Sequence, residues 1–180
     1  MGDPKKQRKK YTKPKHPWQH DRIEEEKELI KDYGLKNKKE IWKIVTLLRG
    51  FSNQVKNLVA LKTEQAEKEK EQLLKRLQSL GLIKKTAQLD DVLSLTPKDI
   101  MERRLQTIVH RKGLAKSMKQ ARQFIVHGHI KIKDKKITVP SYVVGKDEEA
   151  LVTFMQKSSL SNLEHPERVI KKKQEKKKSE

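Results

Sequence analysis

Residues 102–144 constrain this chain most, because their pattern predicts two short capped helices followed by a small β-hairpin, with charge almost all of one sign. Between residues 111 and 136 there are nine Lys or Arg side chains and a single acid, Asp134. A compact segment with so one-sided a charge repels itself unless a polyanion neutralises it. Nucleic acid is therefore the leading candidate for a partner.

The composition of the whole chain agrees with this reading. The net charge is +20 over 180 residues, and the pI is about 10.0, as in a nucleic-acid binder. Hydrophobic residues make up 33% and aromatic residues 4%, too few for one large core. The absence of Cys excludes disulfides and thiolate zinc sites. No apolar run is long enough to span a bilayer, and the N-terminus lacks a signal-type apolar segment, so we expect a soluble, cytoplasmic protein without membrane contact.

Charge and proline content divide the chain into four parts. Residues 1–22 form a basic arm with eight Lys or Arg and three prolines, which we expect to be extended or disordered when free. Residues 23–95 form a helical unit, which we expect to bind nucleic acid, and residues 96–156 form the helix–helix–hairpin module. Residues 157–180 form a basic tail. The expected fold class is α+β and mostly helical, with basic tails at both ends.

Sequence patterns indicate where the helices of residues 23–95 begin and end. Asn37 and Glu40 have the spacing of a capping box, and the apolar face that follows is predicted to end near Gly50. A shorter periodic segment follows around residues 55–59. Residues 64–76 predict an exposed helix with paired charges that stops at Gly81, and Asp90-Asp91 is predicted to lie in a turn.

The module begins at Thr96-Pro97, which predicts one helix that ends at Gly113. Ser117 and Gln120 open a second helix, which Gly128 closes. One side of this second helix is apolar, and the opposite side carries cations and amides. The sequence then alternates with period two, which predicts a hairpin around a turn at residues 133–135.

The module resembles the RNA-binding domain named after ribosomal protein S-four. The resemblance rests on Arg104-Leu105, Ser117, Ala121-Arg122-Gln123, His127-Gly128-His129-Ile130 and Val139-Pro140-Ser141-Tyr142. The N-terminal run is similar to the archaeal and eukaryotic branch of that ribosomal protein, through Tyr11, Pro14, His16-Pro17-Trp18, residues 33–38 and Glu40-Ile41-Trp42-Lys43. Together the matches cover most of residues 8–145.

The family resemblance and the charge pattern give one set of candidate RNA-binding residues. Matched to the family motif are Arg104, Arg111, Ser117, Arg122, Gln123 and His127. Charge and position on the helix or strand add Lys112, Lys116, Lys119, His129, Lys131, Lys133 and Lys135. The arm contributes Lys9, Lys10, His16 and Trp18. The rings of His16 and Trp18 could stack on bases.

No catalytic, cofactor or metal site is expected. His127 and His129 have no third ligand nearby, the seven glycines are isolated, and the bacterial branch's zinc-binding Cys cluster has no counterpart in this chain.

The expected function is that of a structural RNA-binding protein of the small ribosomal subunit, which recognises RNA shape and phosphates. The resemblance implies early binding to the 5′ region of small-subunit RNA, a position near the mRNA entry path and contact with ribosomal protein S-five. Two alternatives stay open: an RNA-modifying enzyme or tRNA synthetase that carries the same module, and a free-standing RNA chaperone. An enzyme would need a larger apolar core, and a chaperone would leave the N-terminal run unexplained.

Overall fold

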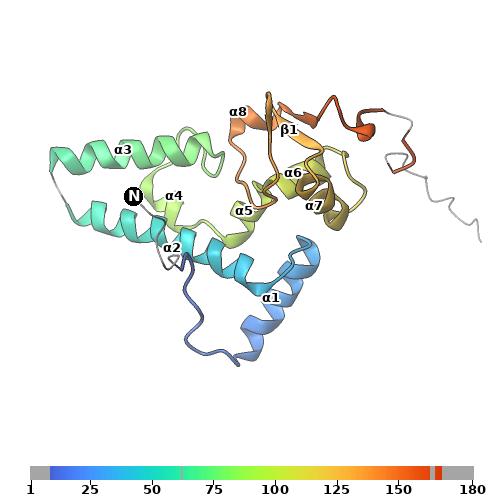
Figure 1. Cartoon of the computed structure of the whole chain (residues 1–180). Coiled ribbons are helices and arrows are strands. Elements are labelled where there is room, and N and C mark those ends of the chain that lie inside the picture. Colours follow the sequence, from blue (N-terminus) through green and yellow to red (C-terminus); the bar gives the residue numbers. More distant parts are fainter. Residues whose placement is uncertain (1–8, 62, 163–164, 168–180) are drawn as a thin grey trace, which may run out of the picture.

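The computed structural model describes residues 9–61, 63–162 and 165–167. In this part the chain is mostly helical with one small sheet, as the α+β prediction requires (Figure 1). The elements are α1 (His20–Asp32), α2 (Lys38–Ala60), α3 (Glu64–Ser79), α4 (Leu89–Leu93), α5 (Pro97–Glu102), α6 (Leu105–Arg111), α7 (Met118–Val126), β1 (Ile130–Ile132), β2 (Lys135–Lys136), α8 (Lys146–Glu149), β3 (Val152–Phe154) and the 3₁₀ helix η1 (Ser159–Ser161). Among the described helices, none is both long and apolar enough to cross a membrane.

Helix α2 is the axis of the N-terminal half, and α1, α3, α4 and α5 all pack against it. Figure 1 shows α3 beside the C-terminal part of α2, with α1 at the other end. Two apolar clusters result. One joins α2 to α3 and α4 around Val55 and Leu77, both fully buried, and the other joins α1, α2 and α5 around Ile41 and Met101.

The predicted end of the helix near Gly50 is wrong, because α2 continues to Ala60. Gly50 is exposed, and a Cβ added there would meet nothing within 4 Å. A glycine inside a helix costs roughly 1 kcal/mol relative to alanine. Burial of Phe51, Val55 and Leu58 against α3 and α4 outweighs that cost, so tertiary packing decides the boundary.

The predicted helix over residues 64–76 is confirmed as part of α3, and so is its stop. Gly81 has φ +70°, and its N–H and that of Leu82 donate to the last turn of α3. Asp91 lies in a short helix, not in the predicted turn. Its carboxylate accepts a hydrogen bond of 2.9 Å from the backbone N–H of Gln88, which caps α4.

The single helix predicted from Thr96 to Gly113 is instead two helices, α5 and α6, with a break at Arg103-Arg104. A returning segment pairs with the backbone at this break. Arg104 forms a β-bridge with Val143, and the N–H of Leu105 donates to the Tyr142 carbonyl at 2.8 Å. These long-range hydrogen bonds replace the helical ones, which no local sequence pattern could indicate.

The sheet has the order β2-β1-β3 and is antiparallel throughout. The predicted hairpin is confirmed as β1 and β2, whereas β3 was not expected; it pairs Phe154 with Ile130. At the turn, Lys133 adopts the left-handed conformation with φ +54°. Helices α6 and α7 cover the sheet's inner face and close a core around Ile108, Ile125 and Ile130, all fully buried.

Candidate nucleic-acid interface

Helix α7 presents a polar face because its opposite face is fixed in the core. Ser117 caps the helix as predicted, since its hydroxyl accepts a hydrogen bond of 3.2 Å from the Gln120 N–H. Ala121, Phe124 and Ile125 are buried beneath it. The exposed face carries the predicted side chains Lys116, Lys119, Gln123 and His127, with Gln120 half-buried among them.

The hairpin carries a second group of lysines. Lys131 on β1 lies directly opposite Lys136 on β2, and Lys133 and Lys135 are exposed beside them. Like charges in cross-strand register destabilise a sheet unless an anion neutralises them. In the described part of the chain, no ion pair involves any of these lysines or those of α7.

Lys136 is a residue that the sequence reasoning missed. Its side chain covers Gly128, where an added Cβ would lie 1.9 Å from the Lys136 Cε. The Lys136 side chain is flexible and can move aside, so the requirement for glycine at position 128 rests on its φ of +75°. The available signal was the strand alternation, which places Lys136 on the same face as Lys131.

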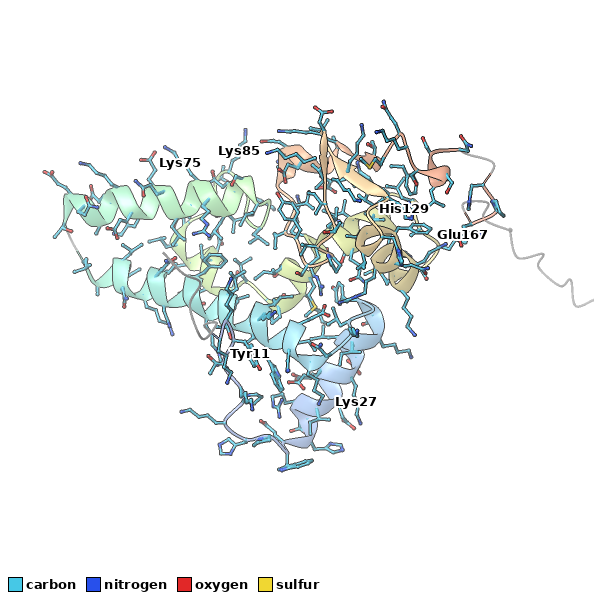
Figure 2. The ribbon with its side chains drawn as sticks, viewed as in Figure 1. Tyr11, Lys27, Lys75, Lys85, His129 and Glu167 are labelled. Atoms are coloured by element: carbon cyan, nitrogen blue, oxygen red, sulfur yellow. The ribbon has the colours of Figure 1, made fainter. Side chains whose placement is uncertain are left out.

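The last described residues lie against α7. The Lys116 ammonium donates to the Pro166 carbonyl at 3.1 Å, and the Gln120 amide donates to the Glu167 carbonyl at 3.4 Å. Figure 2 shows His129 and Glu167 at the same end of the module. Of the basic tail expected over residues 157–180, residues 163–164 and 168–180 lie outside the described residues.

His127 and His129 lie at the C-terminal end of α7, where the chain turns toward β1. His127 is the C-terminal cap residue of α7, and its ring stacks on that of His129 with centroids 6.4 Å apart. The His129 Nδ1 lies 2.8 Å from the Ser158 hydroxyl. Within the described residues, no group of three potential ligands could hold a metal ion.

Two of the predicted RNA-binding residues bind a carboxylate of the protein itself. Arg104 is 2% exposed, and its Nη2 donates to a Glu40 carboxylate oxygen at 2.8 Å. Arg122 contacts both oxygens of the same carboxylate, at 2.6 and 3.2 Å. Glu40 therefore joins α2 to the break before α6 and to α7, across more than 60 residues of sequence.

The predicted capping box at Asn37 does not form. The Asn37 side chain makes no capping hydrogen bond, and the Glu40 carboxylate contacts the two arginines. Burial alone would raise the pKa of Glu40. The hydrogen bonds from Arg122 and Arg104 outweigh that effect, so its pKa lies below the usual value and the carboxylate stays ionised.

Two other predicted RNA-binding residues of the module, Arg111 and Lys112, bind groups of the protein itself. Arg111 forms an exposed ion pair of 3.1 Å with Glu102. Lys112 donates to the Ala150 carbonyl at 2.9 Å and so holds the segment before β3. Arg111 therefore differs by its ion pair from the lysines of α7 and the hairpin, which form none in the described part of the chain.

The arm lies along the N-terminal helices and not along α7 (Figure 1). Tyr11 packs on Trp42 with ring centroids 6.0 Å apart, and the Lys9 ammonium lies 5.0 Å from the centre of the Tyr11 ring. Trp18 is 90% exposed, and His16 and Lys10 are also exposed. The helix α1 begins at His20, within the stretch that the sequence assigns to the arm.

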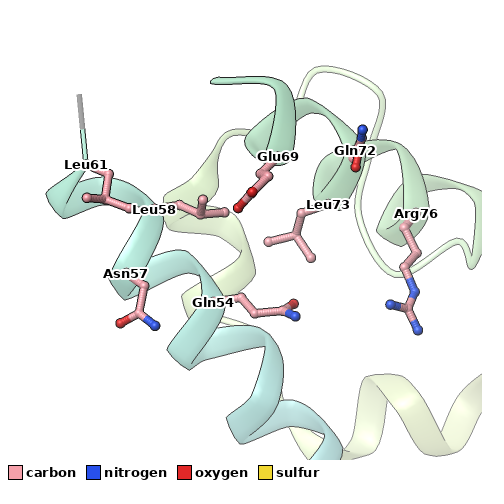
Figure 3. A pocket seen from close by; sticks show the side chains of 8 residues that line it. All are labelled: Gln54, Asn57, Leu58, Leu61, Glu69, Gln72, Leu73 and Arg76. Carbon is pink, nitrogen blue, oxygen red and sulfur yellow. The ribbon is translucent and has the colours of Figure 1, made fainter. Parts of the chain in front are cut away.

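A hollow in the N-terminal half has no excess of basic residues in its lining. It has a volume of about 630 Å³ and lies between α2 and α3, where Gln54, Asn57 and Gln72 surround the leucine side chains (Figure 3). Its one cation, Arg76, lies over the Phe51 ring, and Glu69 offsets that charge. Because its charges balance, this hollow differs from α7 and the hairpin, where positive charge is in excess.

Comparison with known proteins gives one match within the module and others over most of the chain. Residues 103–149 match the S4 domain family. A protein of Methanococcus aeolicus named small ribosomal subunit protein uS4 is 53% identical over 169 residues, which cover 93% of this chain and 96% of the relative. Proteins of the same name from Nanoarchaeum equitans and Ignicoccus hospitalis are 49% and 52% identical, over 94% and 86% of this chain and over 96% and 93% of their own lengths. The chain therefore belongs to the family of the small ribosomal subunit protein uS4.

Proposed function

We propose that this chain is a structural constituent of the small ribosomal subunit and binds the ribosomal RNA of that subunit through α7 and the hairpin. One observation carries the proposal: among the described residues, Lys119 on α7 and the hairpin lysines Lys131, Lys133, Lys135 and Lys136 form no ion pair with an acid. Closely spaced phosphates supply the missing negative charge. Since lysines dominate, recognition rests on phosphate arrangement and RNA shape more than on base identity.

Membership in the family also decides between the alternatives. The chain is not an enzyme, because its relatives are ribosomal proteins that it matches over 93–96% of their own lengths. A free-standing chaperone that needs only the module is disfavoured as well. The matched regions include the N-terminal helices, and Glu40 ties these helices to the module.

The proposal extends to the place of the protein in the subunit. We expect binding early in assembly at the 5′ region of the small-subunit RNA, near the mRNA entry path of the cytoplasmic ribosome and beside ribosomal protein S-five. Family resemblance supports these points. The exposed Trp18 and the basic residues Lys9 and Lys10 are proposed as a second set of RNA contacts, distinct from α7.

Replacement of Lys119 by Ala tests the proposed surface. Lys119 is exposed on α7, so the melting temperature should not change. Loss of one phosphate contact should lower the slope of log affinity against log salt concentration by about 1. The measurement is an equilibrium titration of purified small-subunit RNA at several salt concentrations. An unchanged slope and affinity would remove Lys119 from the interface.

A further inference from the structure

A cleft of about 510 Å³ lies between the N-terminal end of α2 and the module. Lys39 and Lys43 of α2 line one side, and Arg104, Arg122 and Ser141 line the other. Glu40 is the single acid in the lining, against four cations. The cleft is therefore positive, although its walls come from segments that are distant in the sequence.

The floor of the cleft holds a guanidinium without enough acceptors. Arg104 is 2% exposed, and only its Nη2 has a partner, Glu40. Its Nε and Nη1 are buried and have no hydrogen-bond acceptor among the described residues. Arg122 shares the same carboxylate, so one negative charge serves two guanidinium groups. Buried charges in proteins are normally paired, and this shortage leaves an excess of positive charge at the floor of the cleft, which favours an anion in the cleft above it.

The rim of the cleft offers free donors at the positive end of a long helix. Lys39 and Lys43 are exposed, lie one turn apart on α2, and take part in no ion pair of the described chain. Asn37 lines the cleft with an amide that does not cap the helix. Helix α2 has 23 residues, and its N-terminal end carries a partial positive charge that favours anions.

We propose that this cleft binds a backbone phosphate of the ribosomal RNA, held by Lys39, Lys43 and Arg122 above the buried charge of Arg104. The proposal rests on the proposed function and adds a second, separate phosphate site. A phosphate has several acceptor oxygens and matches a set of donors that converge from two walls. Arg122 stands on α7, so the cleft adjoins the polar face of that helix and one RNA segment can reach both. RNA bound here would contact the N-terminal helices and the module together.

The test compares two double variants in titrations of purified small-subunit RNA at several salt concentrations. Lys39→Ala with Lys43→Ala removes the rim cations of the cleft. Lys56→Ala with Lys68→Ala removes two exposed lysines of α2 and α3 that lie outside it. All four side chains are exposed, so both variants should melt like the parent protein. The cleft variant is expected to lower the salt slope by about 1 and to weaken binding, and the control is expected to do neither.

Several results would overturn the proposal. A cleft variant that binds RNA like the parent protein, or a control that loses as much as the cleft variant, would show that the cleft holds no specific phosphate. A variant that keeps its RNA slope but no longer enters assembled subunits would indicate a protein occupant. The Lys119→Ala variant separates this site from the proposed function: if it weakens binding while the cleft variant does not, only the cleft assignment fails.

Inorganic phosphate distinguishes the source of the bound group. Titrated at constant ionic strength, it should raise the melting temperature of the control more than that of the cleft variant, because a ligand stabilises only a protein that binds it. If this difference is present but the RNA slopes of the two variants are equal, the cleft is a site for free phosphate and the RNA assignment is wrong. If neither difference is present, no anion site exists there.

Discussion

Replacement of Glu40 by Gln is expected to lower the free energy of unfolding by about 3 kcal/mol at neutral pH, since it leaves two guanidinium groups without their shared charge. Arg104 is almost fully buried and cannot turn to solvent, whereas the side chain of Arg122 is 23% exposed and can recover part of its hydration. Chemical denaturation of the full chain measures this change. An amide at position 40 can still accept one hydrogen bond, so the loss reports mainly the charge.

The matched control is Glu71→Gln. Glu71 forms an ion pair of 2.6 Å with Lys75 on the exposed side of α3, where both side chains are well solvated. Such surface pairs contribute little to stability, so this variant should unfold like the parent protein. Equal effects of the two substitutions would show that Glu40 does not join the N-terminal helices to the module.

The contact of Glu40 with the two arginines also predicts how the Glu40→Gln difference depends on pH. The pKa of Glu40 is lowered in the folded chain, so this contact contributes its full stability above the unfolded pKa of about 4.3. This contribution is lost as the pH falls through the lowered, folded pKa. Denaturation curves of parent and variant should therefore converge in acid. A difference that persists unchanged at the lowest pH would contradict the ionic origin of the effect.

Replacement of Ile125 by Ala is expected to cost about 3 kcal/mol of stability through the cavity that it leaves. Ile125 is fully buried on the inner face of α7, against the core that includes Ile108 and Ile130. The adjacent Val126 is 53% exposed, and its replacement by Ala should change stability by less than about 0.5 kcal/mol. The two variants alter neighbouring positions of one helix, so their comparison isolates burial.

Both α7 variants also have an expected effect on RNA binding. At a temperature where the Ile125→Ala variant is partly unfolded, its apparent affinity should fall in proportion to the folded fraction. The Val126→Ala variant should bind like the parent protein. Denaturation and titration of the same preparations check this. If Ile125→Ala loses affinity while fully folded, the core would have to act on the RNA surface in some way other than by holding α7 in place.

Sequence patterns predict the structure best where a feature depends only on residues that are close together in the sequence. The cap at Ser117, the stop at Gly81 and the alternation of β1 depend on spacing within one turn or one strand, and all three are confirmed. The exposed face of α7 also follows from helical periodicity alone, because the residues opposite it are apolar.

The errors occur where a distant segment decides the outcome. Helix α2 passes Gly50 because α3 and α4 pack on the residues beyond it. The break before α6 exists because residues 142–144 return to pair with it. A distant residue also determines a contact in the candidate site that the sequence does not indicate. Glu40 binds Arg104 and Arg122, from which it is separated by 64 and 82 residues. Replacement of Arg122 should therefore reduce stability, and it does not report RNA contact alone. The RNA-binding role of the two arginines stays a prediction.

Site-specific crosslinking from α7 tests the central claim most directly, because the chain contains no Cys and a single introduced thiol is unique. Lys119→Cys places this thiol on the exposed face of α7, and Lys75→Cys places one on the outer side of α3 as a reference. Each variant carries a short photoactivated crosslinker, is assembled into small subunits and is irradiated. If α7 lies on the RNA, the Lys119→Cys variant forms crosslinks within one discrete region of the ribosomal RNA, and this region differs from any that Lys75→Cys reaches. Crosslinks from Lys119→Cys to proteins alone would contradict the account.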